Sequence, residues 1–278
     1  HKDFAGAVEA AASTGGQLMP PVMGAAAFLM AEFVGVPYID IVKAAIVPAF
    51  LYFAGIWLGV HFEAKRGNLK GIPRSQLPKI GTILRERGHL ALPLIVIVYL
   101  LVSGYTPMRA ALVAIVLSIL CSALRKSTRM KPIEIVRGLD RGARNVLSVL
   151  VACASAGIII GVVTKTGVGL KLASGLLDLS GGLLLPTMFF TMITAIILGM
   201  GVPTTANYVI TSTIAAPALV QMGVPVLCAH MFVFYFGIIA DVTPPVALAA
   251  FAGSGISGGN PLRTGINASK LAIAAFII

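Results

Sequence analysis

Two short stretches, 199–207 and 241–245, gather oxygen-bearing groups inside otherwise apolar sequence. Hydroxyl groups, an amide oxygen and the backbone carbonyls of Gly199, Gly201 and Val242 are hard ligands that suit a hard cation such as Na⁺. Asp241 is the single carboxylate of this region, and an ionisable group at membrane depth is a functional candidate. The alternative is a pair of turns whose polar groups bond to neighbouring helices. The predicted binding residues are Gly199, Gly201, Pro203, Thr204, Thr205, Asn207, Asp241, Thr243 and Pro244.

A short helix is predicted over 3–13, and a second set of polar and small residues follows as a break over 13–21. It has the same kinds of group but no accompanying stretch like 199–207. We therefore predict half of an equivalent ion or substrate site here. Its candidate residues are Ser13, Thr14, Gly15, Gly16, Gln17 and Pro20.

Both sets lie at a proline pair followed by valine and small residues, and the two pairs are 224 positions apart. Pro20-Pro21 and Pro244-Pro245 each remove two backbone donors, so a regular helix cannot continue through them. In a membrane chain such a break survives where it is buried in protein or lines a wet cavity. Breaks at equivalent places in two halves of a chain point to the binding site of a transporter.

The composition is that of a membrane protein. Hydrophobic residues make up 58% of the sequence and charged residues 11%, against about 25% charged in a typical soluble domain. The mean hydropathy is +0.96. Abundant Ala, Gly and Leu with little alternation of polarity indicate helices. The predicted fold class is therefore an all-α polytopic membrane protein.

The net charge of +11 comes mainly from two segments, 65–87 and 125–144, which each hold seven of the 21 basic residues. Two basic loops that flank a helical hairpin are typical of the cytoplasmic side of a membrane protein. This distribution argues against nucleic acid as a partner and for the lipid bilayer. We expect a multi-pass protein of the bacterial or archaeal cytoplasmic membrane.

Counting segments from these loops gives the predicted topology. The segment 183–222 is predicted as a re-entrant hairpin with its tip at 199–207. The helix broken at Pro20 runs outward and the helix broken at Pro244 runs inward, so the repeat is inverted. The other predicted helices cover 39–60, 89–103, 109–124, 146–164, 165–182 and 262–278, with 131–145 along the inner surface.

No catalytic motif is present in the sequence. It contains no Gly-x-Ser-x-Gly, no His-Glu-x-x-His and no phosphate-binding loop, so we expect neither an enzyme nor coupling to ATP by this chain. The three cysteines have unrelated spacings, which indicates neither a disulfide framework nor a metal site. We expect no organic cofactor and no metal beyond Na⁺ as the coupling ion.

Three runs carry a resemblance to a known family: FAGAVEAAASTGGQLMPPVMG at 4–24, LGMGVPTTA at 198–206 and TPPVALA at 243–249. They closely resemble the large membrane subunit of TRAP (tripartite ATP-independent periplasmic) transporters, and the resemblance covers all 278 residues. The runs are most similar to the fused permeases that work with TAXI-type binding proteins. In the dicarboxylate and sialate branches the breaks usually read Ile-Pro-Pro-Ser and Gly-Thr-x-x-x-Pro-Thr.

This resemblance implies a sodium-driven importer that receives a small organic acid from a periplasmic TAXI-type binding protein. It implies an elevator mechanism, in which two hairpins and two broken helices move against a scaffold. The first hairpin and the small membrane subunit, fused N-terminally in this branch, have no counterpart here, so we expect an internal fragment of a longer permease. The expected parts are 1–34 (first broken helix), 35–182 (mainly scaffold), 183–260 (second hairpin and second broken helix) and 261–278 (a terminal transmembrane helix).

Other functions remain open from the residues alone. A channel or a purely structural membrane subunit can be built on similar broken helices. A proton-coupled antiporter is a further alternative, in which Asp241 or Glu9 would titrate. A channel conducts without saturable sodium-dependent uptake, and an antiporter loses activity when Asp241 becomes Asn.

Overall fold

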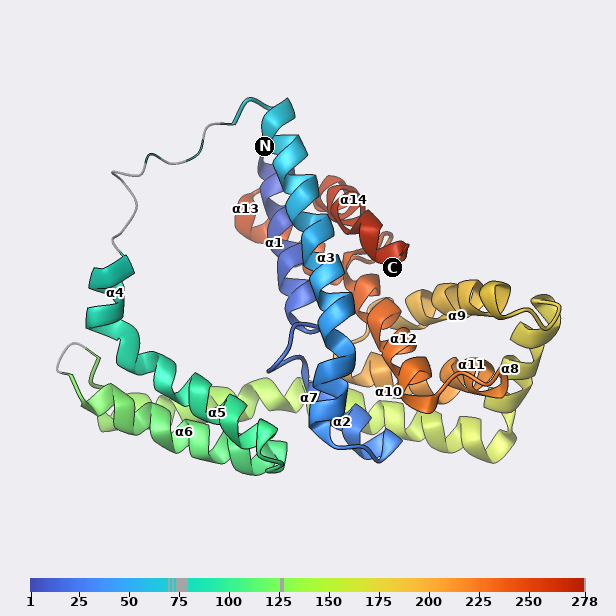
Figure 1. The fold of residues 1–278 in the computed structure, drawn as a ribbon, viewed down its shortest axis with the longest axis horizontal. Coiled ribbons are helices and arrows are strands. Elements are labelled where there is room, and N and C mark those ends of the chain that lie inside the picture. The colour runs from blue at the N-terminus through green and yellow to red at the C-terminus, as the bar shows by residue number, and fades with distance from the viewer. Residues whose placement is uncertain (70, 72, 74–79, 126–127, 278) are drawn as a thin grey trace. The chain divides into compact units, whose positions relative to one another are not determined.

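The computed structural model describes residues 1–278 apart from 70, 72, 74–79, 126–127 and 278, and the described chain contains helices and no strand (Figure 1). The first half holds α1 (Lys2–Gly16), α2 (Ala25–Val34), α3 (Tyr38–Arg66), α4 (Ile80–Arg87), the 3₁₀ helix η2 (Gly88–Ala91), α5 (Leu92–Val102) and α6 (Pro107–Ala123). The second half holds α7 (Pro132–Thr166), α8 (Val168–Leu179), α9 (Leu184–Gly199), α10 (Thr204–Ile214), α11 (Ala216–Gln221), α12 (Val226–Ile239), η3 (Ala240–Val242), α13 (Leu248–Ser257), α14 (Pro261–Leu271) and η4 (Ala272–Phe276). The helical part of the predicted fold class is therefore confirmed.

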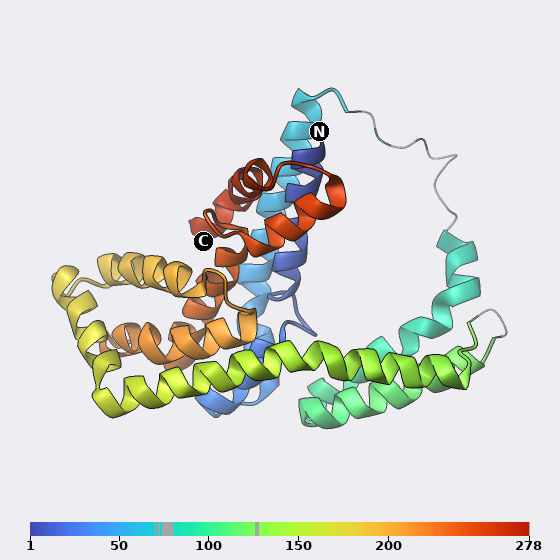
Figure 2. The ribbon, with the colours of Figure 1, turned by 180° about the vertical axis from the view of Figure 1, so that it is seen from behind.

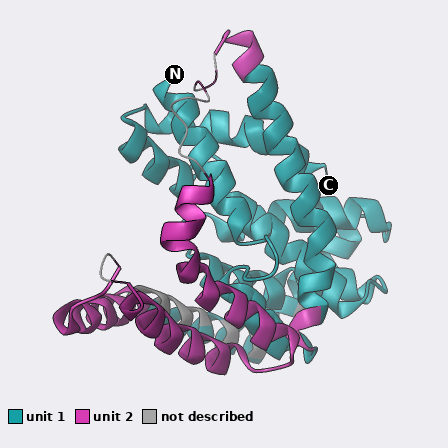
Figure 3. Cartoon of the chain, turned by 60° about the vertical axis from the view of Figure 1, so that its left-hand side comes forward, with its two compact units in different colours: residues 1–36, 40–63, 149–278 teal, residues 37–39, 64–148 magenta. Residues whose placement is uncertain are grey.

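Contacts divide the chain into two compact units (Figure 3). Unit 1 comprises 1–36, 40–63 and 149–278, and it contains both proline breaks. Unit 2 comprises 37–39 and 64–148, where α5 packs against α6 and η2 contacts both α4 and α6. The predicted division into transport and scaffold parts concerns motion, so it stays a prediction.

Helix α1 is longer than the sequence predicted. It continues through Gly16, so the break begins at Gln17 and the expectation that residues 13–16 belong to it is wrong. The reason is the spacing of small residues: Ala7, Ala10, Ala11 and Thr14 are all buried on one face, and this spacing of three and four is that of a helix. The hydroxyl and glycine residues at 13–16 therefore form the last turn of the helix.

The two breaks have the same backbone conformation. The peptide bond is cis in both proline pairs, Pro20-Pro21 and Pro244-Pro245. A residue with positive φ follows each pair at the equivalent position, Met23 at 56° and Ala247 at 39°. The amide of each positive-φ residue donates to the carbonyl group four positions earlier, at 3.2 and 3.1 Å. The repeat seen in the sequence therefore extends to the backbone.

The two broken helices run antiparallel. Asp3 of α1 accepts a hydrogen bond from the backbone amide of Asn260, just after α13, at 2.7 Å. Three residues further along α1, Gly6 lies against Gly253, so the partner number falls as the α1 number rises. The halves also pair crosswise: α1 packs against α13 and α14, while α2 packs against α10 and α12.

The segment predicted as a hairpin forms a helical hairpin in which α9 and α10 contact each other and α12. Its second arm is interrupted, because α10 ends at Ile214 and α11 begins at Ala216. Pro217 accounts for this, since its ring removes an amide donor and clashes with the preceding turn. The single helix expected over 208–222 is thus two helices.

A second difference concerns α7, which is one continuous helix of 35 residues (Figure 2). The sequence predicted a surface helix over 131–145 followed by a separate span over 146–164. After Pro132 the stretch contains no proline, so a change from charged to apolar side chains occurs without a change in backbone. The change in side-chain polarity near residue 145 therefore does not coincide with a helix end.

Among the described residues, α3 is the one helix that is long and apolar enough to cross a membrane by itself, with 29 residues. The other apolar helices have between 10 and 17 residues, because breaks and turns divide them. Helix α3 runs alongside α1 (Figures 1 and 2). The hydroxyl of Tyr52 on α3 donates to the carbonyl oxygen of Ala11 at 2.9 Å, which fixes α3 to the first broken helix.

Candidate functional site

Three segments that are distant in the sequence converge on one carboxylate. The hydroxyl of Thr204, the first residue of α10, donates to Oδ2 of Asp241 in η3 at 3.5 Å. The side chain of Gln17, at the first break, lies within hydrogen-bonding reach of the same carboxylate. The hairpin and both breaks therefore meet at Asp241, and Gln17 of the predicted half-site joins the site predicted at 199–207 and 241–245.

The threonine hydroxyls in this region act as hydrogen-bond donors toward the protein. Thr204 donates a hydrogen bond to Asp241, and Thr243 donates one to the carbonyl oxygen of Ile239 at 2.8 Å. A hydroxyl that donates to the protein keeps its lone pairs for another partner. Both hydroxyl oxygens are thus able to face a cation, and their role as ion ligands stays a prediction.

Glycines shape the turn between α9 and α10. A Cβ atom on Gly199 would lie 2.9 Å from the Cβ atom of Ala240, so α9 can approach η3 this closely only without a side chain there. Gly201 has a φ of 77°, a left-handed conformation that costs other residues about 1 kcal/mol or more. The two glycines let the hairpin turn lie against the second break.

Asn207 has a different place from the one predicted. It lies in α10 and not in the turn, because the helix begins at Thr204. Its Nδ2 donates to the carbonyl oxygen of Gly237 on α12 at 2.7 Å, so the side chain joins the two helices. Its Oδ1 is buried without a hydrogen-bond partner among the described residues, which leaves one free acceptor beside the turn.

The remaining residues of the site predicted at 199–207 and 241–245 make fewer contacts there. Pro203 precedes α10 and is exposed, and Thr205 is half-buried in the first turn of that helix. Pro244 lines a shallow hollow of about 340 Å³ beside α14. The carbonyl oxygen of Val242, expected to face a ligand, accepts a hydrogen bond from Ser269 of α14 at 2.8 Å, so one of its two lone pairs is occupied.

Most of the predicted half-site around α1 does not converge. Ser13 is exposed and donates to Glu9 of the same helix at 3.2 Å. Thr14 is buried, and its hydroxyl has no partner among the described residues. A side chain on Gly15 would collide with the ring of Tyr52, whereas Gly16 faces open space. The structure therefore gives a packing reason for Gly15 but none for Gly16, and Pro20 belongs to the break itself.

Three supporting residues were absent from the predicted sites: Tyr52, Ser269 and Asp3. Tyr52 is almost fully buried (1% exposed) and braces α1 at its last turns. Ser269 holds the second break to α14, and Asp3 holds the loop before α14 to α1. The sequence contains six tyrosines, and nothing in it marks Tyr52 as the one that reaches α1. The other two look like ordinary polar positions in the sequence.

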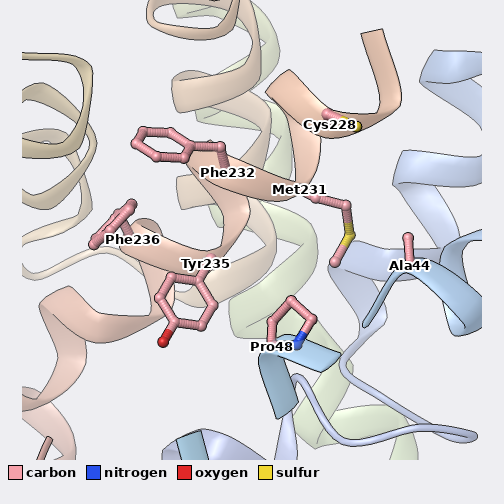
Figure 4. A pocket seen from close by; sticks show the side chains of 7 residues that line it. All are labelled: Ala44, Pro48, Cys228, Met231, Phe232, Tyr235 and Phe236. Atoms are coloured by element: carbon pink, nitrogen blue, oxygen red, sulfur yellow. The ribbon is translucent and has the colours of Figure 1, made fainter. Parts of the chain in front are cut away.

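An apolar hollow of about 240 Å³ lies elsewhere in unit 1, between α3 and α12 (Figure 4). None of the predicted ion-site residues lines it. The hydroxyl of Tyr235, which is buried, has no hydrogen-bond partner in the described part of the chain. The lining residues are Ala44, Pro48, Cys228, Met231, Phe232, Tyr235 and Phe236.

Comparison with known proteins identifies the family. The protein-family model described as tripartite ATP-independent periplasmic transporter, DctM component, matches residues 1–278. Members are multi-pass permeases of the inner membrane and not enzymes, and they work without ATP, with a periplasmic binding protein and a small membrane subunit. A search of curated proteins gave no match. The chain belongs to the DctM family, the large membrane component of TRAP transporters.

Proposed function

We propose that this permease component imports a small organic acid by symport with Na⁺, and that the ion binds where both breaks meet the α9–α10 hairpin. The observation that carries the proposal is the convergence on Asp241. Its carboxylate has Thr204 from the hairpin and Gln17 from the first break as partners. Because three segments build the site, an ion binds there only when all three are in place.

The ends of the helices favour a cation at this place. Helix α1 ends at Gly16, α9 ends at Gly199, and α12 continues through η3 and ends at Val242. Both α1 and α9 contact η3, so three C-terminal ends lie near one another. Each end carries a negative partial charge of roughly half an elementary charge. Carbonyl and hydroxyl oxygens at such ends are the ligands that secondary transporters offer to Na⁺.

In contrast to these C-terminal ends, the N-terminus of α10 suits an anionic substrate. It lies at Thr204, where unpaired amide groups favour an anion. A carboxylate bound there would lie beside a cation at the neighbouring C-terminal ends. Such mutual neutralisation couples the two ligands, since each lowers the electrostatic cost of binding the other. We propose this as the basis of symport.

The antiparallel broken helices support an inverted repeat. We propose that the α9–α10 hairpin is re-entrant and moves with both broken helices as the transport domain of an elevator. The sequence Thr243-Pro244-Pro245-Val246 resembles the branch that uses TAXI-type binding proteins, and we propose such a partner, with the small membrane subunit fused to the permease. The choice of organic acid then rests largely with the binding protein.

Uptake by the intact transport system in proteoliposomes tests the proposed function. The expected result is saturable accumulation of a labelled carboxylate that needs both the binding protein and an inward Na⁺ gradient. A pH gradient in the absence of Na⁺ should drive no uptake. Uptake that follows the pH gradient alone would replace Na⁺ symport by proton coupling, and conductance without saturation would indicate a channel.

Proton-coupled antiport is the second candidate, and one observation favours it. Asp241 is partly buried at the meeting point of the breaks, with two polar side chains as partners. A carboxyl group in that position can carry a proton as well as attract a cation. Replacement by Asn separates the two functions, because it removes the titrating group and keeps one oxygen ligand.

A further inference from the structure

A hollow of about 780 Å³, lined mainly by charged and hydroxyl-bearing residues, lies within unit 2, between the end of α4 with η2 and the end of α6. Its walls include Arg87, Arg125 and Thr128 together with the apolar side chains of Leu90 and Met130. Two adjoining hollows, of about 660 and 610 Å³, share some of these walls. None of the three contains a residue of the proposed ion site.

Polar contacts across the hollow hold its walls together. Nε2 of His89, in η2, lies 3.1 Å from the hydroxyl of Thr128. The guanidinium group of Arg125 donates to the backbone carbonyl of Glu86, in α4, at 3.4 Å. These contacts link segments 39 positions apart in the sequence. The hollow is therefore shaped by tertiary structure and is more than the gap beside one helix.

The walls carry a strong excess of positive charge. One carboxylate, that of Glu86, lines the three hollows with five cationic side chains, those of Arg85, Arg87, Arg125, Arg129 and Lys131. Arg87 makes no hydrogen bond or ion pair with the described residues, so its donors are free. Clustered cations with few counter-charges create a local potential that attracts anions.

The donors available in the hollow select the kind of anion. The hydroxyls of Ser118 and Ser122 donate to carbonyl oxygens of their own helix, both at 2.7 Å, and so offer no proton to a ligand. Recognition rests on the guanidinium groups of Arg87 and Arg125. Their planar forks match the oxygen geometry of a phosphate better than that of a point anion.

Apolar surface continues from the charged walls. Leu90 and Met130 are exposed within the hollow itself. Leu124, next to Arg125, is exposed, as are Leu94 on α5 and Leu120 on α6. A ligand that fits both parts has an anionic phosphate head and an apolar tail.

We propose that this hollow binds the phosphate headgroup of an anionic phospholipid from the cytoplasmic leaflet. The segments 65–87 and 125–144 hold 14 of the 21 basic residues, which is typical of the cytoplasmic side. Basic pockets at that side of membrane proteins suit anionic headgroups. Arg87 and Arg125 hold the phosphate, and Leu90 and Leu124 contact the acyl chains.

Lipid binding by the intact transport complex, measured by native mass spectrometry in detergent, tests the proposal. The wild-type complex should retain phosphatidylglycerol and release phosphatidylcholine. Arg87→Gln should weaken phosphatidylglycerol binding by about fivefold, because one cation at such a site contributes about 1 kcal/mol. The double variant R87Q/R125Q should weaken it by about tenfold or more. Arg87 makes no hydrogen bond or ion pair with the described residues, so the single variant stays informative if the double one unfolds.

Arg137→Gln is the matched control. Arg137 is exposed on α7 within the same basic region, and it lines none of the three hollows. Its loss should change phosphatidylglycerol binding by less than about twofold. An equal loss in R137Q and R87Q would show diffuse surface charge and overturn the site. Displacement of the lipid by millimolar inorganic phosphate, or equal retention of phosphatidylcholine, would overturn the assignment to an anionic lipid.

Discussion

Gly253 of α13 lies so close to Gly6 of α1 that a Cβ atom on Gly253 would stand 2.6 Å from the Gly6 carbonyl oxygen. The obstacle is backbone and cannot rotate away, so the two broken helices touch here because neither carries a side chain. This contact holds the antiparallel pair together on one side of the breaks. It also provides a sharp test of the arrangement.

Gly253→Ala should push α1 and α13 apart and lower the free energy of unfolding by about 1 to 3 kcal/mol, the usual cost of overpacking. Thermal unfolding in detergent, followed by the fluorescence of Trp57, measures the change. Gly255→Ala is the control, since Gly255 lies on the same helix with nothing within 4 Å of a Cβ atom. It should leave the melting temperature unchanged or raise it slightly, because Ala favours a helix over Gly by about 1 kcal/mol. Equal effects of the two variants would contradict the close crossing.

Asn207→Asp should destabilise the contact between α10 and α12. The substitution keeps the size of the side chain and replaces the donor that bonds to Gly237 by an oxygen, so two acceptors face each other. The expected loss is at least about 1 to 3 kcal/mol, the cost of an unsatisfied buried polar group.

The same chemical change at Asn267 provides the control for this experiment. Asn267 is half-buried on α14, and its side chain makes no hydrogen bond with the described residues. Asn267→Asp should shift the melting temperature much less than Asn207→Asp. If Asn207→Asp melts at the wild-type temperature, the amide does not brace the two helices.

The sequence predicted the helical fold, both breaks and the turn at Gly199 and Gly201, because proline and glycine act on the backbone at their own positions. It misplaced the helix ends at Ser13 and Asn207. Both residues have side chains that commonly occur in turns, yet here they lie in helices whose burial pattern outweighs local propensity. The helix α7 shows the same limit, since side-chain polarity alone does not end a helix.

Tertiary relationships were beyond the sequence for a different reason. That Gln17 reaches Asp241 depends on the packing of α1 against α13, which brings together residues more than two hundred positions apart. Ser269 and Asp3 bond to backbone groups of other segments, and no local pattern encodes such partners. The residue types and the family resemblance predicted an ion site, which stays a prediction, while the geometry identifies which residues meet.

Thr204→Ala should raise the Na⁺ concentration for half-maximal uptake by the intact transport system. The substitution removes a proposed hydroxyl ligand and the bond to Asp241, and a loss of about 0.5 to 1.5 kcal/mol corresponds to roughly twofold to tenfold. Thr204→Ser keeps the hydroxyl and should stay near the wild type. Thr243→Ala should act in the same direction as Thr204→Ala. Unchanged Na⁺ dependence in both alanine variants would remove these residues from the ion site.

Asp241→Asn separates Na⁺ symport from proton coupling. The asparagine side chain keeps one oxygen that can accept from Thr204 or Gln17, and most of the proposed ligands are carbonyl and hydroxyl oxygens. Na⁺-driven uptake should therefore persist, with half-saturation at a Na⁺ concentration raised by less than about tenfold, the equivalent of 1.4 kcal/mol. Uptake should be measured with Na⁺ and pH gradients imposed separately, and thermal unfolding should confirm that the variant is folded. A folded variant without any uptake, together with a wild type that responds to the pH gradient alone, would make Asp241 a proton carrier. That outcome would sink the Na⁺ assignment, because a neutral oxygen ligand would then have failed where only a titrating group succeeds.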